Sequence, residues 1–396
     1  MAPPIDLLSP SAFRGSQPHE QFAWLREHDP VHRHTEPDGP GFWALTRYED
    51  VRAVGRDPGR FSSQPTIMID DPRPGGTFGD HRMMLMADPP LHTRMRRLLS
   101  REFTPRAAEA LRGRIAELAT GIVDAVAGRD RCDLVGDIAG EMPSFVIAEL
   151  LGIPLEDGRR LYACTEALHS VRGHNRSAQA AAFEEMFGYS QKVWREKSAD
   201  PGEDLSSLLI AGEIDGVAQD HIDFFLWFLL LVDAGGDTTR NLVGGGILAL
   251  FEHPEQRAWL TEDLEARLPT AIEELLRWVS PVIYMRRTVT VDTVLNSTSL
   301  GAGDKVVMYY GAANRDPTVF PDADQLRLDR TPNPHVAFGG GGPHFCLGAH
   351  LARVEIACLL QELLVRCPDL TPVGPAEWPD SNFIYGPRTL PVRLRR

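Results

Sequence analysis

The segment from residue 338 to residue 348, Phe-Gly-Gly-Gly-Gly-Pro-His-Phe-Cys-Leu-Gly, constrains the fold of this chain more than any other. Four consecutive glycines add no side chain to a core and lose much conformational entropy on folding, so a backbone requirement must account for them. The segment leads into one cysteine, Cys346, and apolar residues at helical spacing follow between residues 349 and 363. Backbone N–H groups and the dipole at the start of a helix stabilise a negative sulfur. The sequence therefore predicts a thiolate at position 346.

A thiolate in this setting is what a cysteine-ligated haem iron requires, because thiolate ligation favours cleavage of the O–O bond. The segment resembles the haem-binding loop of the cytochrome P450 family, with one residue more between Phe338 and Cys346 than the commonest form. Some bacterial lipid- and sterol-oxidising members share this extra residue. The resemblance implies haem b as the cofactor, with Cys346 as the axial iron ligand, Phe338 and Gly348 beside the haem, and His344 as a propionate ligand. The alternative is a buried structural cysteine, which is our interpretation of Cys132, Cys164, Cys358 and Cys367.

Composition and charge narrow the class of protein. Apolar residues make up 43% of the 396 residues and charged residues 24%, as in ordinary globular proteins. The net charge of −14 argues against nucleic acid as a partner. Five cysteines without paired spacing suit a reducing compartment. The N-terminus lacks the pattern of a signal peptide, and the longest apolar stretch, 224–232, is too short to span a bilayer. We expect a cytoplasmic protein without a membrane anchor.

A long helix is predicted from about residue 217 to residue 250, and its middle reads Ala-Gly-Gly-Asp-Thr-Thr over 234–239. These residues are poor helix formers, so a kink or a group packed close against the backbone must explain them. The motif resembles the oxygen-activation site of the P450 family. The resemblance implies that Thr238 hydrogen-bonds the bound dioxygen, that Asp237 helps deliver protons, and that Ala234 lies beside the haem. The alternative is a notch for helix packing.

Basic residues form a second candidate site. His92 and Arg96 lie four residues apart on one face of a predicted helix, and such a pair can bind carboxylates. The P450 family uses this pair for the haem propionates, and Arg287 matches a further propionate ligand. Other arginines extend the first pair into a basic patch that can dock an acidic partner, or form a solvated face paired with Glu102: Arg94, Arg97 and Arg101.

Glu274 and Arg277 lie three residues apart on one predicted helix face and can form a charge-assisted pair. Glu-x-x-Arg alone is a weak signal, but its place between the Asp-Thr-Thr helix and the cysteine loop matches a structural salt bridge of the P450 family. In that family a third residue, often Arg or His, joins from the loop before the haem segment. Here the best match is Gln325, which leaves open whether the network is complete.

The predicted substrate pocket draws on several parts of the chain. An irregular loop over 64–82 ends in Met-Met-Leu-Met, adaptable side chains that suit an apolar ligand or ordinary core filling. By resemblance, the segment between residues 164 and 187 forms a mobile roof, and a hairpin over 381–386 enters the active site. The alternative for Asp233 is that it faces the roof instead of the pocket. We expect the pocket to be lined by Met84, Met86, Asp233, Val282, Ile283 and Ile384.

The motifs occur in the P450 order along essentially the whole chain. The resemblance implies a mainly α fold with a small β region and a single P450 domain over 1–396. The haem then lies between the 217–250 helix and the 338–364 loop and helix. The implied reaction is hydroxylation of an unactivated C–H bond with O₂, in a monomeric enzyme that receives two electrons from a separate ferredoxin and its reductase.

The substrate is predicted from finer resemblance. The glycine-rich loop, the strand over 306–310 and the 381–386 hairpin are most similar to actinobacterial hydroxylases of sterols, methyl-branched lipids and terpenoids, which predicts a bulky apolar substrate. A tailoring oxidase for a polyketide or peptide is the alternative. A peroxygenase is disfavoured because such relatives replace the acid–threonine pair. A catalytically silent scaffold relative is an alternative from another class. Whether the reaction is hydroxylation, epoxidation or C–C coupling stays open.

Overall fold

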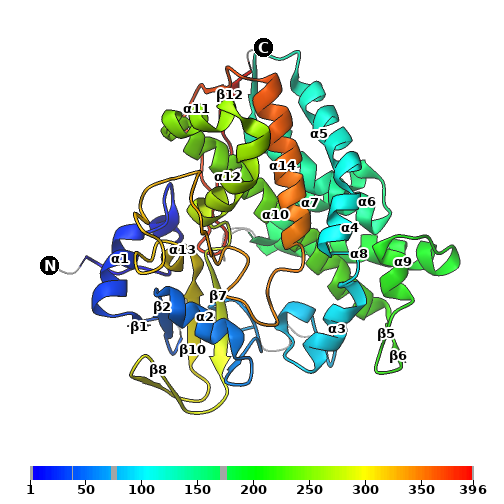
Figure 1. The fold of residues 1–396 in the computed structure, drawn as a ribbon. Coiled ribbons are helices and arrows are strands. Elements are labelled where there is room, and N and C mark those ends of the chain that lie inside the picture. The colour runs from blue at the N-terminus through cyan, green and yellow to red at the C-terminus, as the bar shows by residue number, and fades with distance from the viewer. Residues whose placement is uncertain (1–2, 38, 73–77, 170–175, 395–396) are drawn as a thin grey trace.

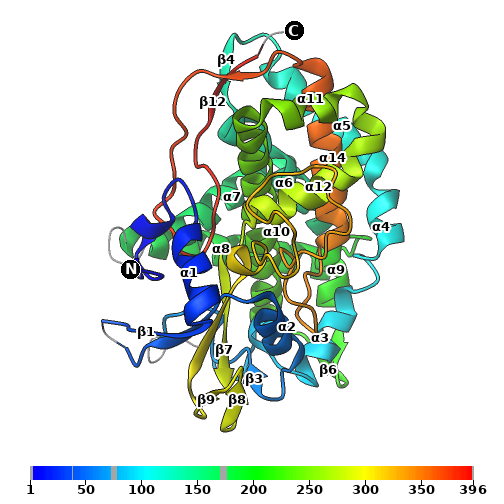
Figure 2. The same ribbon diagram turned by 60° about the vertical axis from the view of Figure 1, so that its left-hand side comes forward.

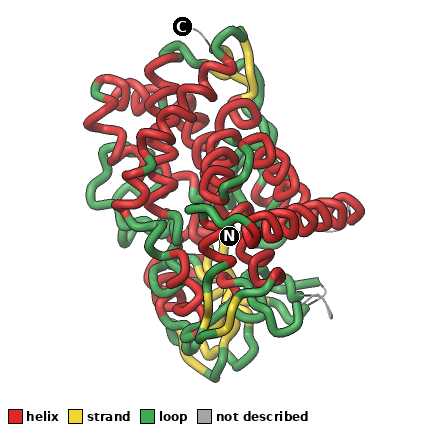
Figure 3. Tube along the Cα trace, turned by 90° about the vertical axis from the view of Figure 1, so that its right-hand side faces the viewer, coloured by secondary structure: helices red, strands yellow, loops and turns green. Residues whose placement is uncertain are grey.

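The computed structural model of the protein describes residues 3–37, 39–72, 78–169 and 176–394. Helices fill most of the molecule and most strands gather at one end, as predicted for a mainly α fold with a small β region (Figure 1, Figure 3). The α-helices are α1 His19–His28, α2 Tyr48–Arg56, α3 Leu91–Leu99, α4 Pro105–Ala110, α5 Arg112–Val126, α6 Glu141–Leu151, α7 Leu155–His169, α8 Arg176–Ala199, α9 Leu205–Ile210, α10 His221–Glu252, α11 Pro254–Glu262, α12 Leu264–Val279, α13 Tyr310–Ala313 and α14 Ala349–Arg366. Shorter helical turns are η1 Pro10–Phe13, η2 Met84–Met86 and η3 Val135–Ala139.

The main sheet has five strands in the order β1-β2-β10-β7-β3. Its strands are β1 Val31–His34, β2 Phe42–Leu45, β3 Phe61–Ser62, β7 Tyr284–Val289 and β10 Lys305–Tyr309. Strand β10 pairs in parallel with β2 and antiparallel with β7, with Lys305 opposite Phe42 and Thr288. A three-stranded sheet joins β4 Arg131–Asp133, β11 Thr371–Pro372 and β12 Pro391–Arg393, and two hairpins join β5 Glu213–Ile214 to β6 Val217–Ala218 and β8 Thr293–Leu295 to β9 Thr298–Leu300. Figure 2 shows β4 and β12 at the end opposite β8 and β9.

Helix α10 runs through the centre of the helical part. It begins at His221, later than the predicted residue 217, because Val217 pairs in the β5–β6 hairpin. The helix start is fixed by a capping box. The Asp220 carboxylate accepts hydrogen bonds from the backbone N–H groups of Ile222 and Asp223, and the Asp223 carboxylate accepts one from the Asp220 N–H. Most residues from Phe224 to Leu250 are buried, so the helix is apolar on several faces.

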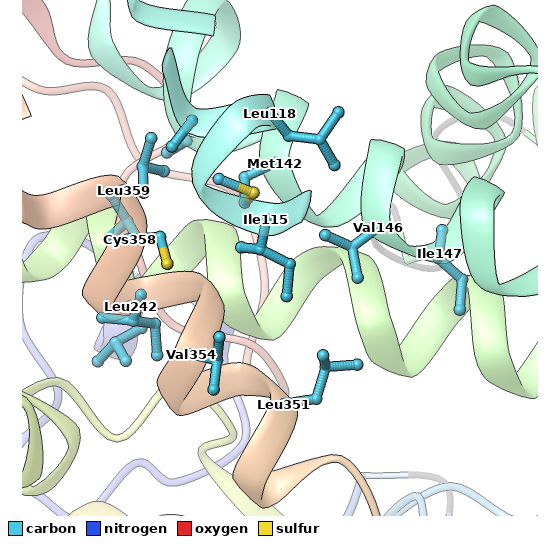
Figure 4. Close-up of a cluster of buried hydrophobic side chains, with 14 of the residues drawn as sticks. Ile115, Leu118, Met142, Val146, Ile147, Leu242, Leu351, Val354, Cys358 and Leu359 are labelled. Carbon is cyan, nitrogen blue, oxygen red and sulfur yellow. The ribbon is translucent and has the colours of Figure 1, made fainter. Parts of the chain in front are cut away.

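The core beside α10 is built by α5, α6 and α14. Figure 4 shows Ile115 of α5, Val146 of α6 and Val354 of α14 directed toward one another around α10. The buried apolar residues of α14 recur at the helical period, which is why the apolar pattern after Cys346 predicted this helix correctly. The four cysteines that were interpreted as structural are all buried: Cys132, Cys164, Cys358 and Cys367.

Two predicted segments are described only in part. Residues 73–77 of the irregular loop and residues 170–175 of the roof lie outside the described residues. Within the described ranges, no single helix is both long and apolar enough to cross a membrane, although Val135–Leu151 and Leu155–Thr165, bent by 116°, meet the length and composition criteria together. That the chain forms a single domain stays a prediction.

Candidate functional site

One cavity lies between α10 and the loop that carries Cys346. Its wall contains nearly all residues of the predicted site, from segments far apart in the sequence. The predicted residues on this wall are Met84, His92, Arg96, Asp233, Ala234, Asp237, Thr238, Val282, Arg287, Phe338, His344, Cys346, Gly348 and Ile384. The fold therefore brings together the thiol, the basic residues and the Asp-Thr pair.

The prediction that Met86 and Ile283 line the pocket is wrong. Neither residue lies on the cavity wall, and both pack in the apolar cluster around Tyr309. Neighbouring side chains of an extended segment point to opposite sides, so Val282 faces the cavity and Ile283 is fully buried away from it. In the short helix η2 the cavity contacts come from Met84 and Leu85 instead.

The glycine run packs against the last turn of α2. A Cβ on Gly340 would lie 2.8 Å from the Val51 carbonyl oxygen, and one on Gly342 would lie 2.3 Å from the Gly55 carbonyl oxygen. Gly342 also has a φ of +79°, which other residues rarely adopt. The close approach and the backbone conformation are the requirement that the four glycines meet. The Cys346 N–H then donates to the Phe338 carbonyl at 2.9 Å, and α14 begins three residues later.

The charge state of Cys346 depends on opposing effects. Burial raises the pKa of the Cys346 thiol, while the Gly348 N–H and the positive charges of Arg96 and Arg353 lower it. The groups that favour the thiolate thus come from the start and first turns of α14 and from α3. A cation in contact with the sulfur would add to them and favour the thiolate further.

Four basic side chains share one part of the wall. The rings of His92 and His344 lie 4.1 Å apart, and a His344 ring nitrogen lies 2.9 Å from the Ser63 hydroxyl. Both ring nitrogens of His92 are buried without a hydrogen-bond partner in the described part of the chain. Arg96 donates to the Pro343 carbonyl at 3.2 Å, and Arg287 donates to the Arg286 carbonyl. Neither contact neutralises a guanidinium.

This cluster concentrates positive charge on one part of a largely apolar cavity wall. Burial and the charges of Arg96 and Arg287 lower the pKa of His92 to about 4, and burial with the same arginines lowers the pKa of His344 to about 2. Burial also lowers the pKa of Arg287. Each shift would be relieved by negative groups on the wall, so the arrangement suits a ligand with carboxylates.

The Asp-Thr-Thr motif lies on α10 at the cavity. Asp237 forms an ion pair with Arg240 at 3.6 Å, with both side chains buried, and the Thr238 hydroxyl donates to the Ala234 carbonyl at 3.1 Å. The Arg240 guanidinium lies over the Tyr162 ring. A Cβ on Gly236 would lie 2.8 Å from the Tyr162 ring, so here a side chain does pack against the helix backbone. The role of Arg240 was not predicted.

The cavity wall also contains a buried acid that was not predicted from the sequence, Glu355 of α14. Its only sequence signal is a charge among apolar positions of that helix. The Thr239 hydroxyl donates to its carboxyl group, and one carboxyl oxygen has no partner in the described part of the chain. Burial raises the pKa of Glu355 to about 8, so the group is protonated at neutral pH.

Glu355 makes the folded state sensitive to alkaline pH. Because its pKa of about 8 in the folded chain exceeds the ordinary value of 4.5, the folded state binds the extra proton and stability falls as pH rises between the two values. From pH 6 to pH 8, wild-type protein is expected to lose about 2 kcal/mol relative to Glu355→Gln, which stays neutral. Urea unfolding at both pH values measures the difference. Parallel pH profiles for the two proteins would contradict the assignment.

The predicted Glu274–Arg277 pair is present and belongs to a larger buried network. Arg277 donates to Glu274 through two nitrogens, at 2.7 and 2.8 Å. The third side chain is Arg330, whose Nε donates to Glu274 at 3.0 Å, and not Gln325. Gln325 contributes only its carbonyl, which accepts hydrogen bonds from both arginines. The irregular segment between α13 and α14, called the meander below, places Arg330 beside the Glu274–Arg277 pair. Asn333 adds another hydrogen bond to Glu274.

The chain is similar to known proteins over nearly its full length. Residues 229–372 match the family model for cytochrome P450. The methyl-branched lipid omega-hydroxylase of Mycobacterium tuberculosis is 38% identical over 389 residues, 94% of this chain and 90% of the relative. The steroid C26-monooxygenase of Mycolicibacterium smegmatis is 36% identical over 397 residues, 98% of this chain and 96% of the relative.

A solved structure has the same fold. The Mycobacterium marinum cytochrome P450 CYP268A2, in complex with pseudoionone, superposes with a TM-score of 0.92 at 37% identity and covers 99% of both chains. Sequence identity above 30% along nearly the whole chain, the matching fold and the Cys346 cavity agree with one another. The chain belongs to the cytochrome P450 family and is a haem-dependent monooxygenase.

Proposed function

We propose that this monooxygenase holds haem b in the cavity between α10 and the Cys346 loop and hydroxylates a methyl-branched apolar lipid. The observation that carries the proposal is the cavity itself, which combines one thiol, four basic side chains and an Asp-Thr pair on largely apolar walls. Bound there, haem supplies the activation of O₂ and the transfer of one oxygen atom to a C–H bond.

The residues of the cavity fit this cofactor. Cys346, just before the start of α14, would hold the haem iron through its sulfur. The propionates would accept hydrogen bonds from His92, Arg96, Arg287 and His344, and would relieve the excess positive charge and the unpaired nitrogens of His92. Ala234, Phe338 and Gly348 are the remaining wall residues we assign to haem contact.

The residues of α10 would handle protons. Arg240 holds the Asp237 carboxylate beside the cavity, where it can take a proton from solvent and pass it on. The Thr238 hydroxyl donates to the Ala234 carbonyl, so its oxygen keeps lone pairs that can accept a hydrogen bond from a neighbouring donor. The pair thus forms a short path from the acid to the cavity.

Changing these two residues is expected to impair turnover without loss of haem. Asp237→Asn keeps the shape but cannot carry a proton as a carboxylate, and product formation is expected to fall about 10²-fold. Thr238→Ala is expected to consume reductant and O₂ while releasing hydrogen peroxide in place of product. Product, reductant and peroxide are measured together, and the absorption spectrum reports haem content. Wild-type coupling in both variants would refute the proposed path.

The substrate class follows from the cavity wall. Apolar side chains dominate the part next to α6, α10 and the C-terminal hairpin: Leu85, Val146, Ile147, Trp227, Leu230, Met285 and Phe383. Asp233 is the acidic exception there. The relatives named above are a methyl-branched lipid omega-hydroxylase and a steroid C26-monooxygenase, and a neighbour is solved in complex with pseudoionone. A bulky branched hydrocarbon chain would be oxidised where it reaches the haem.

An optical titration tests the substrate class. Purified ferric protein is titrated with a methyl-branched fatty acid, its straight-chain isomer and a sterol, and binding is read from the shift of the haem absorption band. The proposal predicts tighter binding of the branched chain than of the straight one, followed by a hydroxylated product with a ferredoxin and its reductase. If none of these three ligands binds and a carrier-linked polyketide chain does, the result would favour a tailoring oxidase instead.

Electrons would arrive at the basic face of α3. Arg97 and Arg101 are exposed there, whereas Arg94 is paired with Asp215 at 2.9 Å. Arg96 lies on the same helix and reaches the Cys346 loop through the Pro343 carbonyl. This patch on an acidic chain offers an acidic ferredoxin a docking site close to the cofactor.

A further inference from the structure

Residues 78–86 form part of the cavity wall and are attached to α10 at two points. Phe78 packs its ring against Phe183 of α8 and Phe225 of α10, with centroids 6.1 and 5.7 Å away. The second attachment is ionic and comes from His81. Met84 and Leu85, which follow His81 closely in the sequence, line the cavity.

His81 faces a carboxylate on each side of its ring. Its Nδ1 lies 2.9 Å from an Asp223 oxygen, and its Nε2 lies 3.6 Å from an Asp220 oxygen. Neutral imidazole has one N–H and one lone pair, so one carboxylate would face a lone pair. Only the imidazolium has a donor for both. The geometry therefore selects the charged form.

The two carboxylates are held in place by their own helix. Asp220 and Asp223 form the capping box of α10, so the start of that helix fixes their positions. The remaining charged neighbours are Asp80 on the same segment and His221 on α10, while Arg82 turns back to the Gly79 and His81 carbonyls. The hydrogen bond with Asp223 raises the pKa of His81 above its ordinary value of 6.5.

We propose that protonated His81 is a positioning residue that holds the Met84–Leu85 wall of the substrate cavity against the capping box of α10. Nothing in the monooxygenase reaction itself requires this contact. The direction of the pH dependence follows from the proton affinities of the attached and detached states. The attached state binds the proton more tightly than the detached state, so the attachment is fully present below about pH 6.5 and is lost as pH rises through the higher pKa of the attached state.

Amide hydrogen exchange of the haem-loaded protein tests the proposal. Exchange is followed by mass spectrometry in peptides covering residues 78–90, at pH 6 and pH 9, with correction for the intrinsic exchange rates. Chelator is present because His81, Asp220 and Asp223 lie close enough together to share a metal ion. Protection of the wild-type segment is expected to fall about 2- to 5-fold at pH 9, as for the loss of one exposed ion pair.

Variants separate positioning from a merely structural role. His81→Gln and Asp223→Asn are expected to show low protection at both pH values, and His81→Lys, which stays charged, high protection at both. His221→Gln changes an exposed histidine at the same helix end and is expected to keep the wild-type profile. The proposal is overturned if wild-type protection does not change with pH, or if His81→Gln keeps the wild-type profile.

Discussion

Cys346→Ala is expected to abolish monooxygenase activity and to change the haem absorption spectrum. Among the described residues the cavity wall carries no second cysteine, so no other thiolate can replace the one just before α14. Thiolate ligation supplies the electron density that favours O–O cleavage, and haem held without it lacks this effect. Turnover with the redox partners and the absorption spectrum of the reduced protein with carbon monoxide measure the change.

Cys358→Ala is the matched control. Cys358 lies on α14, the helix that follows Cys346, but is buried against Arg112 and away from the cavity wall. Removing its sulfur leaves a small void that is expected to cost about 1 kcal/mol of stability, with the haem spectrum unchanged. Equal loss of activity in both variants would mean that the Cys346 effect reports general damage to α14.

Glu274→Ala is expected to destabilise the folded chain by about 3–5 kcal/mol. Glu274 is fully buried, and its carboxylate accepts from Arg277, Arg330 and Asn333 and from the Arg327 backbone N–H. Removing the carboxylate leaves two buried guanidinium groups without a counter-charge. Because the same network fixes the meander that leads into the Cys346 loop, haem content is expected to fall as well. Urea unfolding and the haem-to-protein ratio measure both effects.

The neighbouring Glu273 provides the control. Its carboxylate accepts two hydrogen bonds from Arg353 and lies near His335, but its side chain is 29% exposed. Solvent can replace these partners, so Glu273→Ala is expected to cost about 1 kcal/mol. A loss for Glu274→Ala no larger than that for Glu273→Ala would show that burial of the network does not set its strength.

The parts of the site that could be predicted are those whose signal is local in the sequence. The glycine run needs its unusual backbone, and the apolar period after Cys346 marks a helix, so both were visible without knowledge of packing. The residues around Gly236 in α10 gave a similar local signal, because weak helix formers in a buried helix call for a close neighbour. The structure supplied that neighbour as Tyr162.

The parts that were missed depend on contacts between distant segments. Arg330 lies 56 residues from Glu274 in an irregular meander, where no periodicity indicates which side chain turns inward. In the sequence Glu355 resembles a solvent-exposed charge of a helix, and only the packing of α10 against α14 buries it. Ile283 was assigned to the pocket from its apolar character, which does not distinguish the two sides of an extended segment.

The measurement that tests the central claim most directly is X-ray absorption at the iron edge of the purified ferric protein. The account predicts one sulfur among the atoms bound to iron, and predicts that this sulfur disappears in Cys346→Ala and persists in Cys358→Ala. Iron bound only by nitrogen and oxygen in the wild-type protein would contradict it, because the Cys346 loop would then serve a purpose other than ligation.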